Sequence, residues 1–324
     1  MYRVDAPKIG FFLFLLAIIG IVASLFVPTK IIEIGTLIYP KSASPLNKGY
    51  IGTKKLYDLL QSMGYEVVIA DNEEQLLGYA EKGATVLIIA PDKPLDENES
   101  LILYNLWSKG IINLIVADEN TTSNALLEKY GLSITGKALF QYQLNGYYPY
   151  PYAKLYPGID KIQVVCRFIR TAEEGNTTCS ICKPLSRQNL SSLRFVLRLN
   201  WASLFTISCR DDVRYIIIGE TMPSVVDVND NGVIDSDDVK PGEYTVYIVG
   251  VEVVSDKGSR VIFLSDSFLF TNQAFEMPME NESYILFVKK LVSNIAENGS
   301  RIIIDNSHYI PEKEYMNLPY HPAV

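Results

Sequence analysis

One segment of the chain carries oxygen-bearing side chains at the spacing that calcium binding requires. In the segment 227–238 (DVNDNGVIDSDD), Asp or Asn recurs at alternate positions, a glycine is sixth and an aspartate is twelfth. EF-hand-type loops have this pattern, because Ca²⁺ takes about six to eight oxygen ligands and the sixth residue must turn sharply. The predicted calcium ligands are Asp227, Asn229, Asn231, the backbone carbonyl of Val233, Asp235 and Asp238.

The predicted role of this calcium is structural. Ile234 is the apolar residue expected to anchor the loop, and the closing Asp238, with no amphipathic helix before the loop, resembles the calcium loops of dockerins. Extracellular calcium modules bind with dissociation constants of about 10⁻⁴–10⁻³ M, so such a site stays filled where calcium is plentiful. The alternatives are a regulatory calcium switch and a solvated acidic turn without a metal.

Few groups in the sequence suit catalysis. Only two histidines occur, and no Gly-X-Ser-X-Gly, Walker or Gly-X-Gly-X-X-Gly motif is present. The turns expected after two apolar strands, at 90–92 and 117–119, contain neither Ser nor Cys. We therefore predict no catalytic residue. The alternative is a hydrolase or transferase that acts on envelope glycans through Asp266, Asp305 and His308.

Two loops at predicted strand ends are candidates for ligand binding. The loop 44–53 leads into a helix whose exposed N–H groups attract anions. The segment 265–272 leaves a strand at the edge where open α/β sheets bind ligands. Helix capping and turn formation are the alternative roles. The candidate ligand-binding residues are Asn47, Gly49, Gly52, Thr53, Asp266, Asn272 and His308.

The cysteines and the glycosylation triplets both favour an exported domain. Four clustered cysteines predict two disulfides of open connectivity, with a four-cysteine zinc site as the alternative. These cysteines are Cys166, Cys179, Cys182 and Cys209. Six Asn-X-Ser/Thr triplets are candidate glycosylation sites, at Asn98, Asn120, Asn176, Asn189, Asn281 and Asn298.

The N-terminal segment predicts a membrane helix. Residues 9–27 contain no charge, and at about 1.5 Å per residue they reach across the ~30 Å hydrocarbon core. Arg3 and Lys8 on the short tail 1–8 place the N-terminus in the cytoplasm by the positive-inside rule. We expect a single-pass plasma-membrane protein, anchored through 9–28, with its bulk outside the cell. A cleaved signal peptide is the alternative.

Composition and charge exclude other classes. The 324 residues include 29 Lys and Arg against 37 Asp and Glu, a formal net charge of −8, and 48 % are hydrophobic. This composition is typical of a folded globular protein and not of a disordered chain. Neutralising phosphates supplies much of the affinity for nucleic acids, so an acidic chain without a basic stripe excludes nucleic acid as a partner.

The elements that must position these residues alternate along the chain. Short apolar strands separated by amphipathic helices predict βαβ units and an α/β fold with a Rossmann-like, mostly parallel sheet. The expected strands are 31–39, 65–70, 85–90, 112–117, 213–219, 244–254, 260–264 and 301–304. The expected helices are 52–63, 73–81, 96–109, 123–130 and 280–296.

The chain between the two α/β halves, 29–135 and 213–324, has a different composition and hydrophobic pattern. The segment 140–158 holds six Tyr and three Pro, which favours a packed surface loop or hairpin over a helix. Further strands are expected at 162–169, 193–199 and 203–208. We interpret 136–212 as an inserted β-rich lobe that the disulfides pin.

Three segments carry a resemblance to a known family. The Ser/Asn-rich turn before 52–53 and the segments 266–272 and 305–308 resemble an uncharacterised family of prokaryotic, archaeal-type proteins. Its members are membrane-anchored domains with a class I glutamine-amidotransferase-like fold, related to auxiliary domains of gliding-type ABC transport systems. The similarity spans 35–135 and 213–310. It implies a role in cell-surface or membrane-complex assembly.

Together these observations predict a non-enzymatic, membrane-anchored cell-surface protein with a structural Ca²⁺. Its exported α/β domain is expected to bind a partner protein or a small ligand at the carboxyl edge of the sheet. A passive structural component of the envelope is a further alternative.

Overall fold

The computed structural model describes residues 42–143, 146–157, 164–170, 178–184, 194–208, 210–236, 238, 245–297 and 299–310. These residues belong to one unit, 42–324, which is distinct from residues 1–41. The predicted tail 1–8, membrane segment 9–28 and first strand 31–39 lie outside the described residues. None of the described helices is both long enough and apolar enough to cross a membrane.

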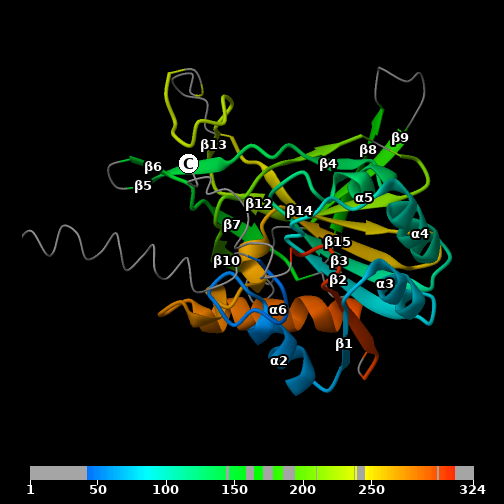
Figure 1. Cartoon of the computed structure of the whole chain (residues 1–324). Helices are drawn as coiled ribbons and strands as arrows, with labels where there is room; N and C mark the ends of the chain where they lie inside the picture. Colours follow the sequence, from blue (N-terminus) through cyan, green and yellow to red (C-terminus); the bar gives the residue numbers. More distant parts are fainter. Residues whose placement is uncertain are drawn as a thin grey trace, which may run out of the picture. The chain divides into compact units, whose positions relative to one another are not determined.

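Five strands form the parallel half of a large sheet, in the order β1–β16–β2–β3–β15 (Figure 1). Every neighbouring pair in this half runs parallel. The four inner strands are short apolar runs that are almost entirely buried, because helices cover both faces. The strands are β1 (Glu66–Ala70), β16 (Arg301–Asp305), β2 (Ala84–Ile89), β3 (Ile112–Ala117) and β15 (Arg260–Leu264).

Five α-helices lie close to the boundaries that the sequence periodicity predicts. They are α2 (Lys54–Ser62), α3 (Glu73–Ala80), α4 (Glu97–Ser108), α5 (Asn124–Lys129) and α6 (Asn281–Ile295). The side chains of Asn72 and Asp96 accept backbone N–H groups at the starts of α3 and α4. These N-caps explain why the helices begin where they do.

The sheet continues beyond β15 with antiparallel strands, so the prediction of a mostly parallel, Rossmann-like sheet is wrong. β15 pairs antiparallel with β14 (Ile248–Val254), and β14 pairs antiparallel with β12 (Arg214–Thr221). The short turn 255–259 is the reason. A parallel crossover needs about a dozen residues or more, whereas this turn permits only a hairpin. The result is a mixed sheet of 11 strands among the described residues.

Strands from the segment 136–212 extend this same sheet instead of forming a lobe beside it. β7 (Tyr152–Leu155) pairs with β12, and β10 (Phe195–Arg198) pairs with β7. β9 (Thr178–Pro184) lies parallel to β12 and pairs with β8 (Val164–Arg170). The buried side chains of β7 and β10 belong to the main hydrophobic core, which explains why this segment joins the sheet.

Two smaller sheets complete the described strands. In one, β5 (Leu139–Gln143) lies between β6 (Gly146–Tyr148) and β13 (Val225–Val226), antiparallel to both. In the other, β4 (Leu132–Ile134) pairs with β11 (Phe205–Ile207). The first part of the tyrosine-rich segment therefore forms the β5–β6 hairpin, and its later part supplies β7.

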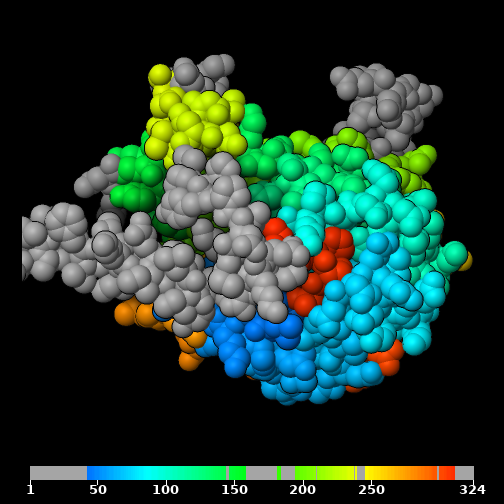
Figure 2. All heavy atoms as spheres, viewed as in Figure 1, coloured from blue at the N-terminus to red at the C-terminus, as the bar shows by residue number. Residues whose placement is uncertain are grey.

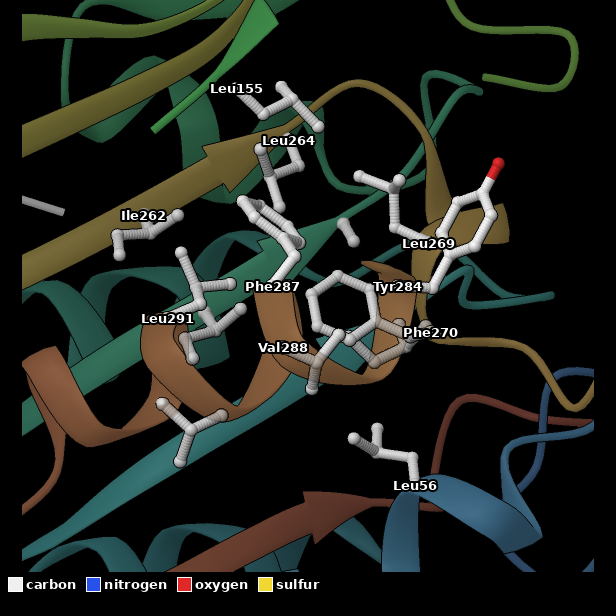
Figure 3. Close-up of a cluster of buried hydrophobic side chains, with 14 of the residues drawn as sticks. Leu56, Leu155, Ile262, Leu264, Leu269, Phe270, Tyr284, Phe287, Val288 and Leu291 are labelled. Atoms are coloured by element: carbon white, nitrogen blue, oxygen red, sulfur yellow. The ribbon is translucent and has the colours of Figure 1, made fainter. Parts of the chain in front are cut away.

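Alternating side chains divide the core between the two faces of the large sheet. In β16, Ile302 and Ile304 face one layer of helices and Ile303 faces the other. Phe287 of α6 and Leu56 of α2 pack on the first face, as Figure 3 shows. Helices α3, α4 and α5 cover the second face.

The substitution Phe287→Ala should lower the free energy of unfolding by about 3–5 kcal/mol, because it removes a buried ring and leaves a cavity. Leu286→Ala is the matched control, since this neighbouring side chain on α6 is 47 % exposed. The control should change stability by less than about 1 kcal/mol. Urea denaturation of the full chain measures both values, and equal losses would contradict the packing of α6 on the sheet.

Candidate functional site

The candidate ligand-binding loops meet at one edge of the sheet. The parallel strands all end there, and the loop 42–53 and the segments 265–272 and 306–310 lie around their carboxyl ends. In Figure 2 the red segment after β16 reaches the surface between the blue loop 42–53 and the cyan chain that follows β2. The edge is therefore where the sequence-predicted site must be tested.

Asn272 ties two of these segments together. Its Nδ2 donates to the carbonyl oxygens of Asn47 (3.0 Å) and Gly49 (2.7 Å), and its Oδ1 accepts from the backbone N–H of Lys55 (2.8 Å). Its own N–H donates to the carbonyl of Gly52. The amide thus caps the start of α2, where the sequence predicts an anion, and its hydrogen-bonding groups are already in use.

Asn47, Gly52 and Thr53 hold the loop 42–53 in shape. Asn47 accepts from the N–H of Gly49 at 2.7 Å, and the hydroxyl of Thr53 donates to a backbone carbonyl at 2.6 Å. A Cβ on Gly52 would lie 2.1 Å from the carbonyl oxygen of Asn47, so only glycine fits there. The structure brings these candidates together, and the side chains of Asn47 and Thr53 donate or accept hydrogen bonds within the loop.

Asp266 is buried and caps the short helix η2 (Ser267–Phe270). Its two carboxylate oxygens accept from the N–H groups of Phe268 and Asn200, both at 2.8 Å. Burial raises the pKa of Asp266 well above its ordinary value, and the nearby Glu119 carboxylate raises it further. Asp266 is therefore a structural acceptor that links the end of β15 to a turn distant in sequence.

His308 lies between two buried carboxylates. Its Nδ1 bonds to Asp305 Oδ2 at 2.8 Å, and its Nε2 bonds to Glu99 Oε2 at 2.9 Å. Burial lowers the pKa of His308, but the hydrogen bonds to Asp305 and Glu99 outweigh burial and raise this pKa to about 10. The imidazole is therefore protonated at neutral pH, donates both bonds and is unsuited to act as a general base.

Glu99 is a site residue that the sequence pattern did not identify. It follows the N-cap Asp96 by three residues, where a glutamate ordinarily reaches back to the start of its helix. Its side chain instead contacts His308, and burial raises its pKa. The sequence signal that could have identified Glu99 is its place on the same face of the helix as the buried Leu103 and Leu106. A charged side chain on such a face needs a buried partner.

The three residues of the hydrolase alternative do not converge. Asp305 and His308 are in contact, but Asp266 follows β15, which β2 and β3 separate from β16. Neighbouring strands lie about 4.8 Å apart, so the two aspartates are separated by far more than a shared proton transfer permits. The hydroxyl of Ser307 donates to Asp305 at 2.5 Å, and the protonated His308 beside it cannot take its proton.

The loop 227–238 folds around its own side-chain oxygens. Asp227 is fully buried, and its carboxylate accepts from the N–H of Gly232 at 2.7 Å. Gly232 has a φ of +81°, which makes the turn at the sixth position. Asp238 closes the loop by accepting from the N–H of Val228 at 2.6 Å. The first and last predicted ligands therefore tie the two ends of the loop to its interior.

The other predicted ligands also contact one another. Asn231 Nδ2 donates to Asp235 Oδ2 at 3.0 Å, and Ile234 packs against the cluster that contains Phe140. Within the described residues, no three Asp, Glu, His or Cys side chains are grouped so as to hold a metal ion. A calcium ion in this loop would therefore also need the amide oxygens of Asn229 and Asn231 and the carbonyl of Val233.

Cys182 is buried in β9 and forms a disulfide. Its Cα lies opposite that of Cys166 in the β8–β9 pair. Among the described cysteines none is free. Cys209 and the side chains of Cys166 and Cys179 lie outside what the structure describes.

Three of the glycosylation triplets can be placed. Asn98 and Asn120 are exposed, and Asn281 is half-buried at the first residue of α6. The remaining three, Asn176, Asn189 and Asn298, lie outside the described residues.

Trp201 is a second candidate that the sequence pattern did not identify. Its φ is +57°, a conformation that bulky residues rarely adopt. Hydrogen bonds hold the turn on both sides, from Asn200 N–H to Asp266 and from Trp201 N–H to the carbonyl of Pro149, each at 2.8 Å. The indole is 39 % exposed and meets the ring of Phe140 edge to face, with centroids 5.7 Å apart. No sequence motif signals such a backbone conformation at a tryptophan.

The substitution His308→Gln should destabilise the protein by about 3–5 kcal/mol, because it leaves buried carboxylates without their cationic partner. Chemical denaturation at pH 7 measures the loss. The double variant Glu99→Gln/His308→Gln should lose less than the two single variants combined, since residues in contact couple. Strictly additive losses would argue against the ion pair.

The same histidine should make the protein less stable as the pH rises. Its pKa is about 10 in the folded state against 6.5 for the free side chain, so its contribution is complete below pH 6.5 and lost as the pH passes 10. His308 alone should lower the free energy of unfolding by up to about 1.4 kcal/mol per pH unit in this interval. Unfolding curves of His308→Gln should show a flatter pH profile, and parallel profiles would refute the assignment.

The matching of this chain to known families agrees with the expectation of an uncharacterised family. A family model described as a domain of unknown function (DUF4350) matches residues 45–286, which is well over half of the chain. The match includes the loop 227–238, called the calcium-type loop below, and Trp201, while Asp305 and His308 lie beyond it. No curated protein matches the chain. The chain therefore belongs to the family of domains of unknown function designated DUF4350.

Proposed function

We propose that this domain is a non-enzymatic binding module of the cell surface, which holds a partner protein or small ligand during envelope or membrane-complex assembly. Its binding surface is the aromatic face, which consists of Tyr142, Tyr147 and Trp201 together with the buried Phe140 that packs beside them. In this proposal Ca²⁺ in the loop 227–238 stiffens the aromatic face.

The observation that carries this proposal is that Trp201 has a strained backbone conformation and an exposed indole ring. A residue in such a backbone conformation costs about 1–3 kcal/mol, and it persists only where its surroundings hold it. Here the buried Asp266 carboxylate and the carbonyl of Pro149 hold the turn, yet much of the indole remains exposed to solvent. A strained backbone that keeps an aromatic ring exposed to solvent indicates that the ring recognises a ligand.

The edge of the sheet supports binding over catalysis. Asn272 and Asn47 use their side-chain amides to hold the loop 42–53, and Asp266 accepts two backbone N–H groups. His308, the histidine among the described residues, is shared by two carboxylates and protonated at neutral pH. These groups hold the fold together, and a general base is not among them.

The packing of the calcium-type loop supports a link to the aromatic face. Ile234 of the loop packs in one small cluster with Phe140 and Tyr147. Lys137, next to β5, donates from its Nζ to the carbonyl of Val228 at 2.8 Å. A calcium ion that rigidifies the loop would therefore also restrain β5 and β6, the strands that carry Phe140 and Tyr147.

Two observations support an exported location. A disulfide at Cys182 is stable in the oxidising space outside the cytoplasm. Asn98 and Asn120, in two of the glycosylation triplets, are exposed and accessible to modification.

Adding Ca²⁺ to the calcium-free full-length protein should raise its melting temperature, because a ligand that binds only the folded state stabilises it by mass action. At about ten times the dissociation constant, the gain in the free energy of unfolding is about 1.4 kcal/mol. Differential scanning calorimetry with and without Ca²⁺ measures the shift.

Asp227→Asn and Asp235→Asn should each reduce this calcium response. Asp256→Asn is the matched control, because Asp256 is exposed in the turn between β14 and β15. An absent shift in the wild type, or an equal shift in all variants, would rule out calcium in this loop.

The binding function is tested by affinity capture of the tagged full-length protein from its native cells in mild detergent, followed by mass spectrometry. Trp201→Ala should lose a partner that the wild type recovers stoichiometrically. Tyr50→Ala should keep it, since Tyr50 is 65 % exposed but belongs to the loop 42–53. A partner that Trp201→Ala retains at wild-type stoichiometry would remove the aromatic face from the proposal.

A further inference from the structure

We infer that the ligand of the aromatic face is a cationic peptide segment, rich in Lys or Arg side chains. The inference rests on the proposed function, because it names the chemistry of the partner for the same surface.

The aromatic face offers ring faces to solvent. Phe140 and Tyr142 are two residues apart on β5 and so share one side of the strand, and Tyr147 is the cross-strand partner of Tyr142. The rings of Tyr142 and Tyr147 meet edge to face, with centroids 5.3 Å apart. Tyr142 is 52 % exposed above Phe140, which is 3 % exposed. Edge-to-face packing covers a face of only one of the two rings, and ring faces carry the negative part of the ring quadrupole.

The calcium-type loop adds negative charge beside these rings. Its Ile234 packs with Phe140 and Val225, and Figure 2 shows the loop in yellow next to the green strands. The segment 227–238 contains five Asp and neither Lys nor Arg, so the two positive charges of one Ca²⁺ would still leave it acidic. Asp230 is exposed and stands outside the set of predicted calcium ligands, so it would keep its charge with calcium bound. An acidic loop that packs next to aromatic rings attracts a cation through two separate interactions.

The chain already pairs a cation with a tyrosine of the same segment. The guanidinium of Arg198 lies over the ring of Tyr150, 5.6 Å from its centroid, and its Nε is 3.9 Å from Glu280. Lys137, which precedes β5, donates to the carbonyl of Val228. Both cations therefore have contacts of their own, apart from the exposed Asp230 of the loop.

Charge complementarity decides among the ligands that an aromatic surface accepts. The acidic loop and the net charge of −8 repel an anionic ligand. A neutral sugar would use the ring faces and gain nothing from the net negative charge. Lys or Arg side chains use both, because their cationic heads interact with the ring faces and with the negative charge of the loop.

Tryptophan fluorescence of the full-length protein provides the test. The chain has two tryptophans, and Trp107 is only 1 % exposed, so a surface ligand changes the signal of Trp201. With saturating Ca²⁺ at low salt, a glycine–lysine peptide should change this fluorescence saturably. Added salt should weaken the binding, because it screens the attraction. A glycine–acetyllysine peptide of equal length should produce no saturable change.

Variants assign the binding to the proposed groups. Tyr142→Ala should weaken binding of the glycine–lysine peptide about two- to fivefold, the effect of one exposed cation–π contact. Asp230→Asn should also weaken binding and reduce its salt dependence. Tyr50→Ala should bind as the wild type does. All three positions are exposed, and unchanged melting temperatures would confirm that the variants fold.

Equal binding of the acetyllysine peptide, or binding of a neutral oligosaccharide such as cellotetraose in place of the lysine peptide, would overturn this inference. If the lysine peptide fails while Trp201-dependent capture of a partner persists, the ligand class alone is wrong. If both fail, the proposed function falls with the inference.

Discussion

Where the chain leaves a buried sheet, its backbone N–H groups no longer have strand partners and must find other acceptors. Along the edge where the parallel strands end, buried carboxylates are these acceptors. Asp118 accepts from the N–H groups of Asn120 and Ser123, and Asp305 accepts from Ser307. Asp266 does the same across two segments far apart in sequence. Burial raises the pKa of Asp118 and Asp266, which reflects the cost of burying a carboxylate. The hydrogen bonds that these carboxylates accept from the loops offset this cost.

This constraint explains why the most site-like residues of the edge are structural and why binding is proposed elsewhere. Polar side chains after parallel strands resemble a ligand site, but here they satisfy the chain's own N–H and carbonyl groups. One of these bonds, from Asn200 to Asp266, holds the turn that displays Trp201. The buried edge thereby holds the turn that carries Trp201, while Phe140, Tyr142 and Tyr147 lie on the small sheet of β5, β6 and β13.

The mixed sheet shows which features of a fold local sequence patterns can predict and which they cannot. The apolar runs and the helical periodicities predicted β2, β3, α4 and α6 to within a residue or two. The same runs could not tell a parallel strand from an antiparallel one, because the antiparallel strands β12 and β14 are mostly buried and apolar, as the parallel strands are. The length of the turn 255–259 was the one local clue to the hairpin that makes the sheet mixed.

The sequence by itself determined the α-helices and the strands of the parallel half, the calcium-type loop with its glycine turn and the absence of a nucleophile motif. These depend on residue types at short separations, which periodicity and turn chemistry report directly. Tertiary structure alone decided that Asn272 caps α2, that Glu99 meets His308 and that Trp201 is held with a positive φ. Each of these joins segments far apart along the chain, and strand order sets which segments meet. β16, near the end of the chain, lies between β1 and β2, and this insertion brings His308 to the first turn of α4.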